Sequence, residues 1–76
     1  MLFDEIKEIL AQQLEISEDE IEMTSSLADD LGAEPMDMVD IGMTLEDQYS
    51  VEVDEAALDT FATVEDIVTF IEANLD

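Results

Sequence analysis

Hydrophobic residues near the start of the chain recur at the spacing of one helix face. Between residues 2 and 14 the apolar positions include Leu2, Phe3, Ile6, Ile9, Leu10 and Leu14. Spacing by three and four residues is typical of an amphipathic α-helix that packs against a core. Asp4 and Glu5 fall in the first turn, where carboxylates interact favourably with the helix dipole. The pattern therefore predicts a helix over residues 2–14.

Residues 15–34 lack this periodicity and are predicted to be a long connection. Connections of this length are uncommon in compact domains unless they have a role of their own. Apolar residues nevertheless occur along it at intervals, at Ile16, Ile21, Met23, Leu27 and Leu31. We expect a loop that is held across the core by these side chains.

The next helix is predicted to begin at Pro35 and to run to about Tyr49 or Ser50. Proline suits the first helical position, where its missing N–H would have no partner anyway. One arc of this helix, about 100° wide, is expected to face the core. It contains Met38, Ile41, Gly42, Leu45 and Tyr49.

A second, smaller apolar patch lies on roughly the opposite side of this helix. It consists of Met36, Val39 and Met43, with Asp37, Asp40, Glu46 and Asp47 beside them. Methionine adapts to differently shaped surfaces, and exposed apolar residues ringed by one sign of charge are typical of a docking surface. The simpler interpretation is scattered surface hydrophobes, which any protein has. The pattern alone leaves both interpretations open.

The last part of the chain predicts a short helical turn over residues 55–60 and one further helix. Thr63 is expected to cap that helix, with Asp66 three residues later as in a capping box, and the helix to reach about Leu75. Its buried stripe is Val64, Ile67, Val68, Ile71 and Leu75. Because Val51-Glu52-Val53 is too short for a sheet, we predict an all-α small bundle that forms one domain over residues 1–76.

Charge adds the strongest constraint on partners. The 76 residues contain 23 Asp and Glu against the single basic residue Lys7, for a formal net charge of −22. Such a chain repels phosphate backbones and anionic lipid, so we expect no nucleic-acid or membrane binding and a basic protein surface as partner. Repulsion among the carboxylates should destabilise the fold. We therefore expect weak binding of divalent cations, no specific metal site, and a melting temperature that rises with Mg²⁺ or salt.

The composition also excludes most catalytic chemistry. The chain has no His and no Cys, so Ser-His-Asp, Cys-His and zinc sites cannot form. Its two glycines, Gly32 and Gly42, make no phosphate-binding loop. We expect a protein that is not an enzyme. An acid-rich N-terminus and the lack of an apolar run of about 18 residues predict a cytoplasmic protein, and we expect a monomer.

Three segments resemble the acyl carrier protein family. The run from Asp29 to Asp40, DDLGAEPMDMVD, resembles the signature Asp-Leu-Gly, a small residue, Asp-Ser-Leu-Asp and an apolar-acidic helix. Residues 45–49, LEDQY, resemble the family's Leu-Glu-Glu-x-Phe, and residues 63–67, TVEDI, its Thr-Val-x-Asp. The resemblance covers essentially the whole chain. It implies a four-helix bundle with a long first loop and a short third helix.

The chain departs from the family pattern at its central residue. The family attaches 4′-phosphopantetheine to the Ser of Asp-Ser-Leu, and the matching triplet here is Glu34-Pro35-Met36. Proline has no hydroxyl, so the resemblance implies that no phosphopantetheine cofactor is bound at Pro35. A smaller departure is the lack of a proline in residues 52–55, which predicts a looser start to the short helix.

The resemblance also implies a docking role for the helix that begins at Pro35. Its acids would meet Lys and Arg on enzymes of fatty acid or polyketide type, and its outer apolar residues would supply the remaining contact. The residues concerned are Glu34, Met36, Asp37, Val39, Asp40, Met43, Glu46 and Asp47.

Two alternatives stay open. The chain is a genuine carrier of fatty acid or lipid biosynthesis whose Ser is altered in this sequence, or it is a small acidic bundle that binds an apolar ligand. In the second case Gly42 would leave room beside Ile41 and Leu45. Otherwise Gly42 only permits close helix packing.

Overall fold

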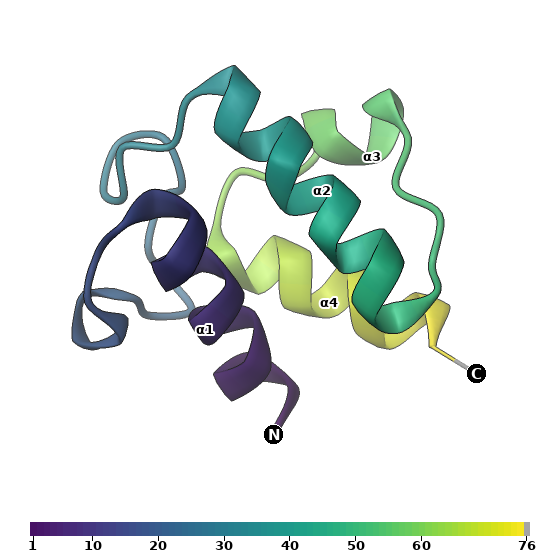
Figure 1. Cartoon of the computed structure of the whole chain (residues 1–76), viewed down its shortest axis with the longest axis horizontal. Helices are drawn as coiled ribbons and strands as arrows, with labels where there is room; N and C mark the ends of the chain where they lie inside the picture. Colours follow the sequence, from purple (N-terminus) through teal and green to yellow (C-terminus); the bar gives the residue numbers. More distant parts are fainter. Residues whose placement is uncertain (76) are drawn as a thin grey trace.

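The computed structural model describes residues 1–75 and consists of helices joined by loops (Figure 1). The elements are α1 (Leu2–Leu14), a 3₁₀ helix η1 (Glu18–Glu20), α2 (Pro35–Tyr49), α3 (Glu55–Asp59) and α4 (Val64–Asn74). The described residues contain no strand, and only an isolated bridge pairs Ser26 with Thr63. The all-α class and the predicted helices are confirmed, whereas η1 was not predicted.

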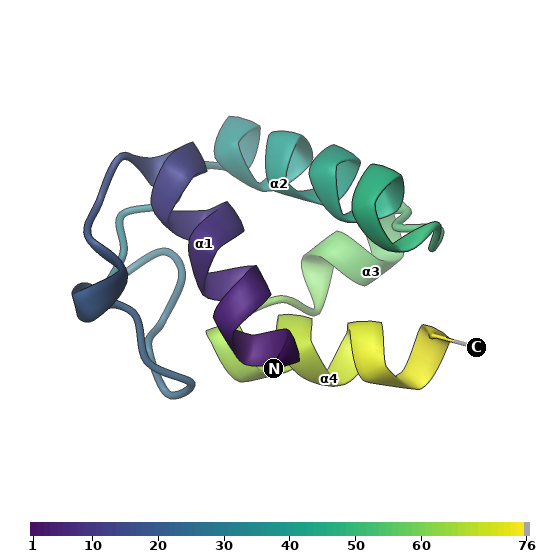
Figure 2. The same ribbon diagram turned by 60° about the horizontal axis from the view of Figure 1, so that its bottom comes forward.

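The helices surround a common core. Helix α1 contacts α2, α4 and η1, and α2 also contacts α3. Viewed as in Figure 2, α2 lies above and α4 below, with α1 crossing between them at one end and α3 lying between them at the other. In this view α2 begins at the end where α1 lies and runs towards the end where α3 lies.

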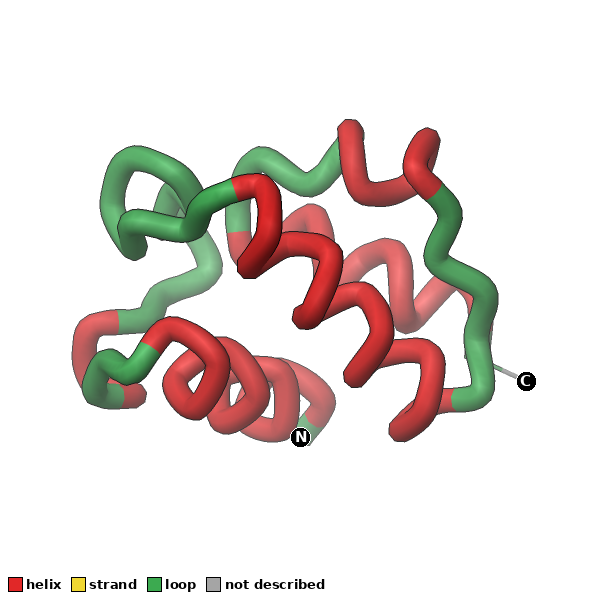
Figure 3. Tube along the Cα trace, turned by 45° about the horizontal axis from the view of Figure 1, so that its top comes forward, coloured by secondary structure: helices red, strands yellow, loops and turns green. Residues whose placement is uncertain are grey.

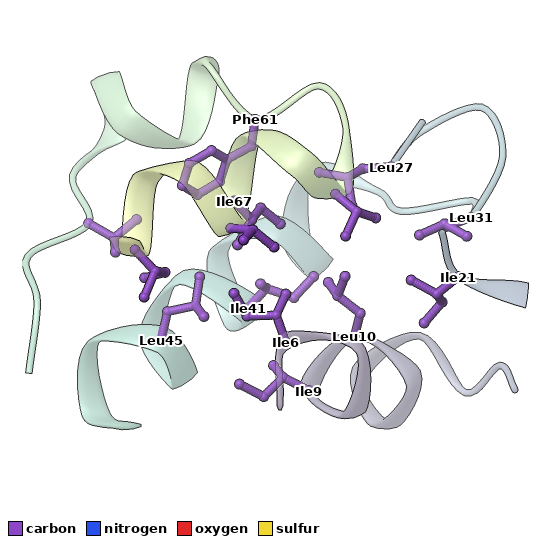
Figure 4. Packing of buried hydrophobic residues seen from close by; sticks show 14 residues of the cluster. Ile6, Ile9, Leu10, Ile21, Leu27, Leu31, Ile41, Leu45, Phe61 and Ile67 are labelled. Carbon is purple, nitrogen blue, oxygen red and sulfur yellow. The ribbon is translucent and has the colours of Figure 1, made fainter. Parts of the chain in front are cut away.

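The core is built from the predicted apolar stripes, with one correction. Leu75, predicted to be buried, follows the last residue of α4 and is 44% exposed. Completely buried side chains come from every long helix and from the connection between α1 and α2. The largest include Ile71 and, labelled in Figure 4, Ile6, Leu10, Leu27, Ile41, Leu45 and Ile67. Each such side chain stabilises the fold by about 1.5–3 kcal/mol relative to an exposed one. Phe61 and Phe70 add an edge-to-face contact with ring centroids 5.4 Å apart. Because the chain has no disulfide, this apolar packing is the main stabilising term.

The long connection over residues 15–34 lies at one side of the helices (Figure 3). Its apolar side chains hold it against the core, as the sequence predicted. Ile21, Leu27 and Leu31 are buried, and Ile16 and Met23 pack against the core from its edge. The 3₁₀ helix within the connection has its own cap, in which Ser17 Oγ accepts the Asp19 N–H at 3.2 Å.

Backbone hydrogen bonds join this connection to the start of α4. The Leu27 N–H donates to the Ala62 carbonyl at 2.9 Å, and the Val64 N–H donates to the Ser25 carbonyl at 3.1 Å. The Glu65 N–H donates to Met23 O at 3.0 Å. The first turn of α4 is thus fixed by a segment far away in the sequence.

The one basic side chain lies on α1. The Lys7 ammonium is 5.0 Å from the centroid of the Phe3 ring and 4.0 Å from a carboxylate oxygen of Asp4. Its side chain is only 24% exposed. The stem therefore packs on the protein while the charge stays near solvent.

No helix within residues 1–75 is both long enough and apolar enough to cross a lipid bilayer.

Candidate functional site

The start of α2 is an exposed helix end formed by Glu34 and Pro35. Glu34 precedes the helix in an extended conformation, with φ −97° and ψ 165°. Its N–H donates to Asp37 Oδ2 at 2.9 Å, which closes the first turn. Gly32, with a φ of 71°, turns the chain just upstream in a conformation that glycine adopts at little cost. The result is a well-defined helix start whose first residue, Pro35, is exposed.

The outer patch, defined as Met36, Val39 and Met43, follows directly. These side chains are 77%, 50% and 59% exposed, respectively. On the inner face of the same helix, Ile41, Gly42 and Leu45 are buried. The predicted division of α2 into a core face and an exposed apolar face is confirmed as geometry.

The predicted acids share this surface but are not equivalent. Asp37 is half-buried and caps the helix through Oδ2, as described above. Glu46 is also half-buried, and its Oε2 accepts the Val53 N–H at 2.9 Å. Both carboxylates therefore also hold the backbone in place, which their positions on a helical wheel do not indicate.

Asp40 and Asp47 are the acids on the body of α2 that remain most available. Both are exposed. Asp40 Oδ2 accepts a long hydrogen bond of 3.4 Å from Gln13 Nε2 of α1, which is at the weak end of such contacts. Within residues 1–75, the Asp47 side chain makes no hydrogen bond or ion pair. Glu34, at the helix cap, is exposed as well.

An open groove of about 560 Å³ runs beside the start of α2. Its walls include Pro35, Met38 and Val39 of α2 and Leu58 of α3, with Ala28 and Ala33 from the preceding loop. Three carboxylates line it as well, at Glu34, Glu55 and Asp59. The groove was not predicted from the sequence, because the position of α3 relative to α2 depends on a tertiary contact.

The lack of a side chain at Gly42 allows α3 to pack close to α2. A Cβ at this position would lie 3.0 Å from Leu58 Cδ2 and 3.5 Å from Val53 Cγ1. Leu58 thus occupies the space that Gly42 leaves open. This geometry favours close helix packing over an empty ligand chamber beside Ile41 and Leu45.

The start of α3 is fixed, contrary to the expectation of a looser start. The Val53 N–H is held by Glu46, and Asp54 Oδ1 accepts the Ala57 N–H at 2.9 Å as a cap of α3. A proline is therefore not needed to define this helix start.

None of the four serines lies at the start of α2. Ser17, Ser25 and Ser26 belong to the connection between α1 and α2, and Ser50 follows the last residue of α2. Ser25 is buried and accepts the Glu22 N–H. Pro35 occupies the exposed position at which a serine would present a hydroxyl.

The far end of α2 is tied to α1 through Tyr49. Its hydroxyl donates to Glu5 Oε1 at 2.9 Å. Burial, followed by this hydrogen bond and the negative charge of Glu5, raises the pKa of Tyr49 to about 12. The phenol is therefore neutral under ordinary conditions and helps to fix the position of α2.

Comparisons with known proteins agree with the fold and with the resemblance. The family model for the phosphopantetheine attachment site matches residues 4–71. The acyl carrier protein of Clostridium perfringens is 43% identical over 70 residues, or 92% of each chain. That of Clostridium acetobutylicum is 38% identical over 76 residues, covering 100% of this chain and 99% of the relative.

A solved structure supports the fold alone. The solution structure of the apo doublet acyl carrier protein from prodigiosin biosynthesis superposes with a TM-score of 0.85 at 22% sequence identity. The match covers 97% of this chain and 36% of that chain, so this chain spans about a third of its length.

Proposed function

This chain belongs to the acyl carrier protein family, and we propose that it docks on acyl-chain enzymes through α2 without carrying 4′-phosphopantetheine at Pro35. Proteins of this family are carriers rather than enzymes, and they interact with acyl-chain enzymes. The observation that carries the proposal is an exposed proline at the start of α2, directly beside an exposed apolar patch with acids around it. Attachment of the arm needs a side-chain hydroxyl, so Pro35 does not fit the family's cofactor.

The docking part of the proposal rests on the outer patch and its charge. Met36, Val39 and Met43 would supply apolar contact, and the neighbouring acids would select a basic partner surface. A single exposed ion pair contributes only about 0–1 kcal/mol, so several acids must act together. We assign the largest share of this electrostatic contribution to Asp40 and Asp47, because the carboxylates of Asp37 and Glu46 also accept backbone hydrogen bonds. Glu34 would contribute at the helix cap.

Intact mass spectrometry tests the carriage part. The chain with Pro35 and its variant Pro35→Ser are incubated with coenzyme A and a permissive phosphopantetheinyl transferase. We expect only the serine variant to gain the mass of the arm. Modification of the chain with Pro35 would contradict the proposal, since another residue would then carry the arm.

The same experiment also tests whether the transferase recognises α2. Both the proposed function and the alternative of a genuine carrier whose Ser is altered in this sequence require this recognition. Efficient modification of Pro35→Ser shows that the transferase still recognises α2. Lack of modification of both proteins would mean that this recognition is lost, and the docking role would lose its support.

Binding to a basic, carrier-dependent acyl-chain enzyme tests the docking part. We expect saturable binding that weakens with salt and weakens further in the double variant Asp40→Asn/Asp47→Asn. The matched control is Glu65→Gln/Glu72→Gln, which removes the same charge from exposed positions on α4. An equal loss of affinity in both double variants would show that binding responds only to net charge, and this result would contradict the docking role of α2.

A further inference from the structure

We propose that Met36 and Met43 form a reversible oxidation site, and that their conversion to sulfoxides by hydrogen peroxide weakens docking through α2. This inference rests on the proposed docking function and adds a way of regulating it. Oxidation replaces two apolar side chains with polar ones on the surface that meets the partner.

Methionine is the only source of sulfur in this chain. The sequence contains five methionines and no cysteine, so a peroxide finds no thiol that would react first. Peroxides convert a methionine thioether to a sulfoxide, and dedicated reductases reverse this change. Any response of the protein's sulfur to peroxide must therefore come from its methionines.

The structure divides the five methionines by exposure. Met36 and Met43 are 77% and 59% exposed on the outer face of α2, whereas Met23 and Met38 are half-buried and pack against the core. Met1, which precedes α1, is 93% exposed and does not belong to the outer patch. Because the oxidant must reach the sulfur atom, we expect Met1, Met36 and Met43 to react before the other two.

Met36 and Met43 share one face of α2. They are seven residues apart, which is close to two helical turns, and Val39 lies between them. A partner segment that covers the outer patch therefore covers both side chains. The family triplet Asp-Ser-Leu has leucine where this chain has Met36. An oxidisable side chain thus occupies a position at which the family pattern has an inert one of similar apolar character.

The reaction is the transfer of one oxygen atom. The thioether sulfur attacks one oxygen of hydrogen peroxide, the O–O bond breaks and an S–O bond forms, and the second oxygen leaves as water with both protons. The sulfur is oxidised and the peroxide is reduced by the same electron pair. Hydrogen peroxide is uncharged, so the formal net charge of −22 does not repel it.

A sulfoxide changes what the outer patch offers to a partner. Its oxygen accepts hydrogen bonds from water while the patch is exposed, and docking would bury it. Burial of a polar group without a hydrogen-bond partner is unfavourable. The neighbouring carboxylates are acceptors and cannot supply a donor, and in the proposed complex the partner's Lys and Arg face Asp40 and Asp47. We expect oxidation of both methionines to weaken binding about tenfold.

The test oxidises the chain alone and then measures its binding to the basic acyl-chain enzyme of the docking experiment. Hydrogen peroxide is removed before mixing, so that the enzyme stays unmodified. Fragmentation mass spectrometry locates each added oxygen. We expect affinity to fall as Met36 and Met43 are oxidised. Treatment with both methionine sulfoxide reductases, one for each sulfoxide epimer, should restore it.

Two leucine variants separate the outer patch from the other methionines. Met36→Leu/Met43→Leu keeps the apolar contact, because leucine and methionine are similar in volume, and removes both sulfur atoms from the patch. We expect it to bind as the unsubstituted chain does and to keep its affinity after peroxide treatment, although Met1 is still oxidised. The matched control, Met23→Leu/Met38→Leu, should lose affinity on oxidation as the unsubstituted chain does.

Denaturation distinguishes a local effect on the patch from unfolding. Because Met36 and Met43 are exposed, their oxidation should leave the midpoint of urea denaturation unchanged. A lower midpoint that accompanies the loss of affinity would show that oxidation disrupts the fold, and the inference would be wrong.

Three results with the enzyme would also overturn the inference. Unchanged affinity with Met36 and Met43 both oxidised would show that the patch tolerates sulfoxides, and the proposed function would stand. An equal loss of affinity in oxidised Met36→Leu/Met43→Leu would place the sensitive sulfur outside the patch. Lack of binding before any oxidation would contradict the proposed function, and this inference with it.

Discussion

Helices α2 and α4 begin with the same local arrangement but in different surroundings. Each has an aspartate at its third position that accepts the N–H of the residue before the helix. In α2, Asp37 Oδ2 accepts the Glu34 N–H at 2.9 Å, and in α4, Asp66 Oδ2 accepts the Thr63 N–H at 3.0 Å. Asp66 Oδ2 also accepts the Ala62 N–H at 3.0 Å.

The two helix starts differ in how far the neighbouring segments bury them. The first residue of α4, Val64, is completely buried, and the long connection is hydrogen-bonded to the backbone around it. The first residue of α2, Pro35, is exposed, and so is Met36. A capping box therefore fixes where a helix starts, whereas the neighbouring segments decide whether that start is available to another molecule.

Truncating one apolar side chain at each helix start tests this difference in burial most directly. Val64→Ala should lower the free energy of unfolding by about 2 kcal/mol, because a buried side chain leaves a cavity. Met36→Ala should change it by less than about 0.5 kcal/mol, since an exposed side chain makes few contacts. Urea denaturation measures both. Similar losses would mean that the start of α2 is also part of the core.

Removing the cap residues is expected to have a smaller effect. Thr63→Ala should cost about 1 kcal/mol, the usual loss for a threonine cap, because Thr63 Oγ1 accepts the Asp66 N–H. Glu34→Ala should cost clearly less, since glutamate is not among the preferred cap residues. A larger loss for Glu34→Ala in the same denaturation experiment would reverse the ranking of the two helix starts.

The two ends of α2 also differ. The far end is hydrogen-bonded to α1 through Tyr49, whereas Pro35 and Met36 at the start are exposed. Tyr49→Phe removes the hydrogen bond to Glu5 and should cost about 1 kcal/mol or less at neutral pH, since this contact is partly exposed. The pKa of Tyr49 is raised to about 12 in the folded protein. Its contribution to stability is therefore present below pH 10 and is lost as the pH rises towards 12.

Tyr49 is the only tyrosine, so phenolate absorbance reports this titration alone. Glu5→Gln should lower its midpoint. A midpoint near 10, the ordinary pKa of tyrosine, would show that the contact with α1 does not persist in solution.

The smallest effect on stability is expected when the charge of one of the two capping aspartates is removed. The backbone N–H groups of Thr63 and Ala62 lower the pKa of Asp66 below its ordinary 3.8. A lowered pKa gives stability that is present above the ordinary value and is lost as the pH falls through the folded value. Asp66→Asn should therefore be less stable than the unsubstituted chain at pH 7, and the difference should shrink below about pH 4.

Asp37→Asn serves as the comparison. Asp37 Oδ2 accepts one backbone N–H where Asp66 Oδ2 accepts two, so its destabilisation at pH 7 should be smaller. Thermal denaturation at pH 7 measures both variants. A larger destabilisation from Asp37→Asn would show that the cap of α2 is the stronger one.

The elements that could be predicted from the sequence are those set by local periodicity. The apolar spacing of α1, Pro35 at the start of α2 and Thr63 before α4 each determine a helix through nearby residues. The exposure of Met36, Val39 and Met43 also follows from helical geometry once the core face is known.

What could not be predicted depends on contacts between distant residues. The bond from the Val53 N–H to Glu46 and the approach of Leu58 to Gly42 both depend on how α3 returns to α2. The groove between these helices is their joint product. The 3₁₀ helix is different, because the local spacing of Ser17 and Glu20 is that of a capping box and is enough to indicate a helical turn.

The packing of Lys7 on Phe3 has a practical consequence for handling the protein. Lys7 is the only lysine or arginine in the sequence, and it lies in the first half of α1. Figure 1 shows that α1 begins at the opposite side of the molecule from the start of α2. Coupling through this side chain would therefore tether the molecule with the start of α2 facing the solution. Trypsin would likewise have one cleavage site, after Lys7, which lies within α1 and against the Phe3 ring. Because a folded helix resists the protease, the rate of this single cleavage would report on the folded state of α1.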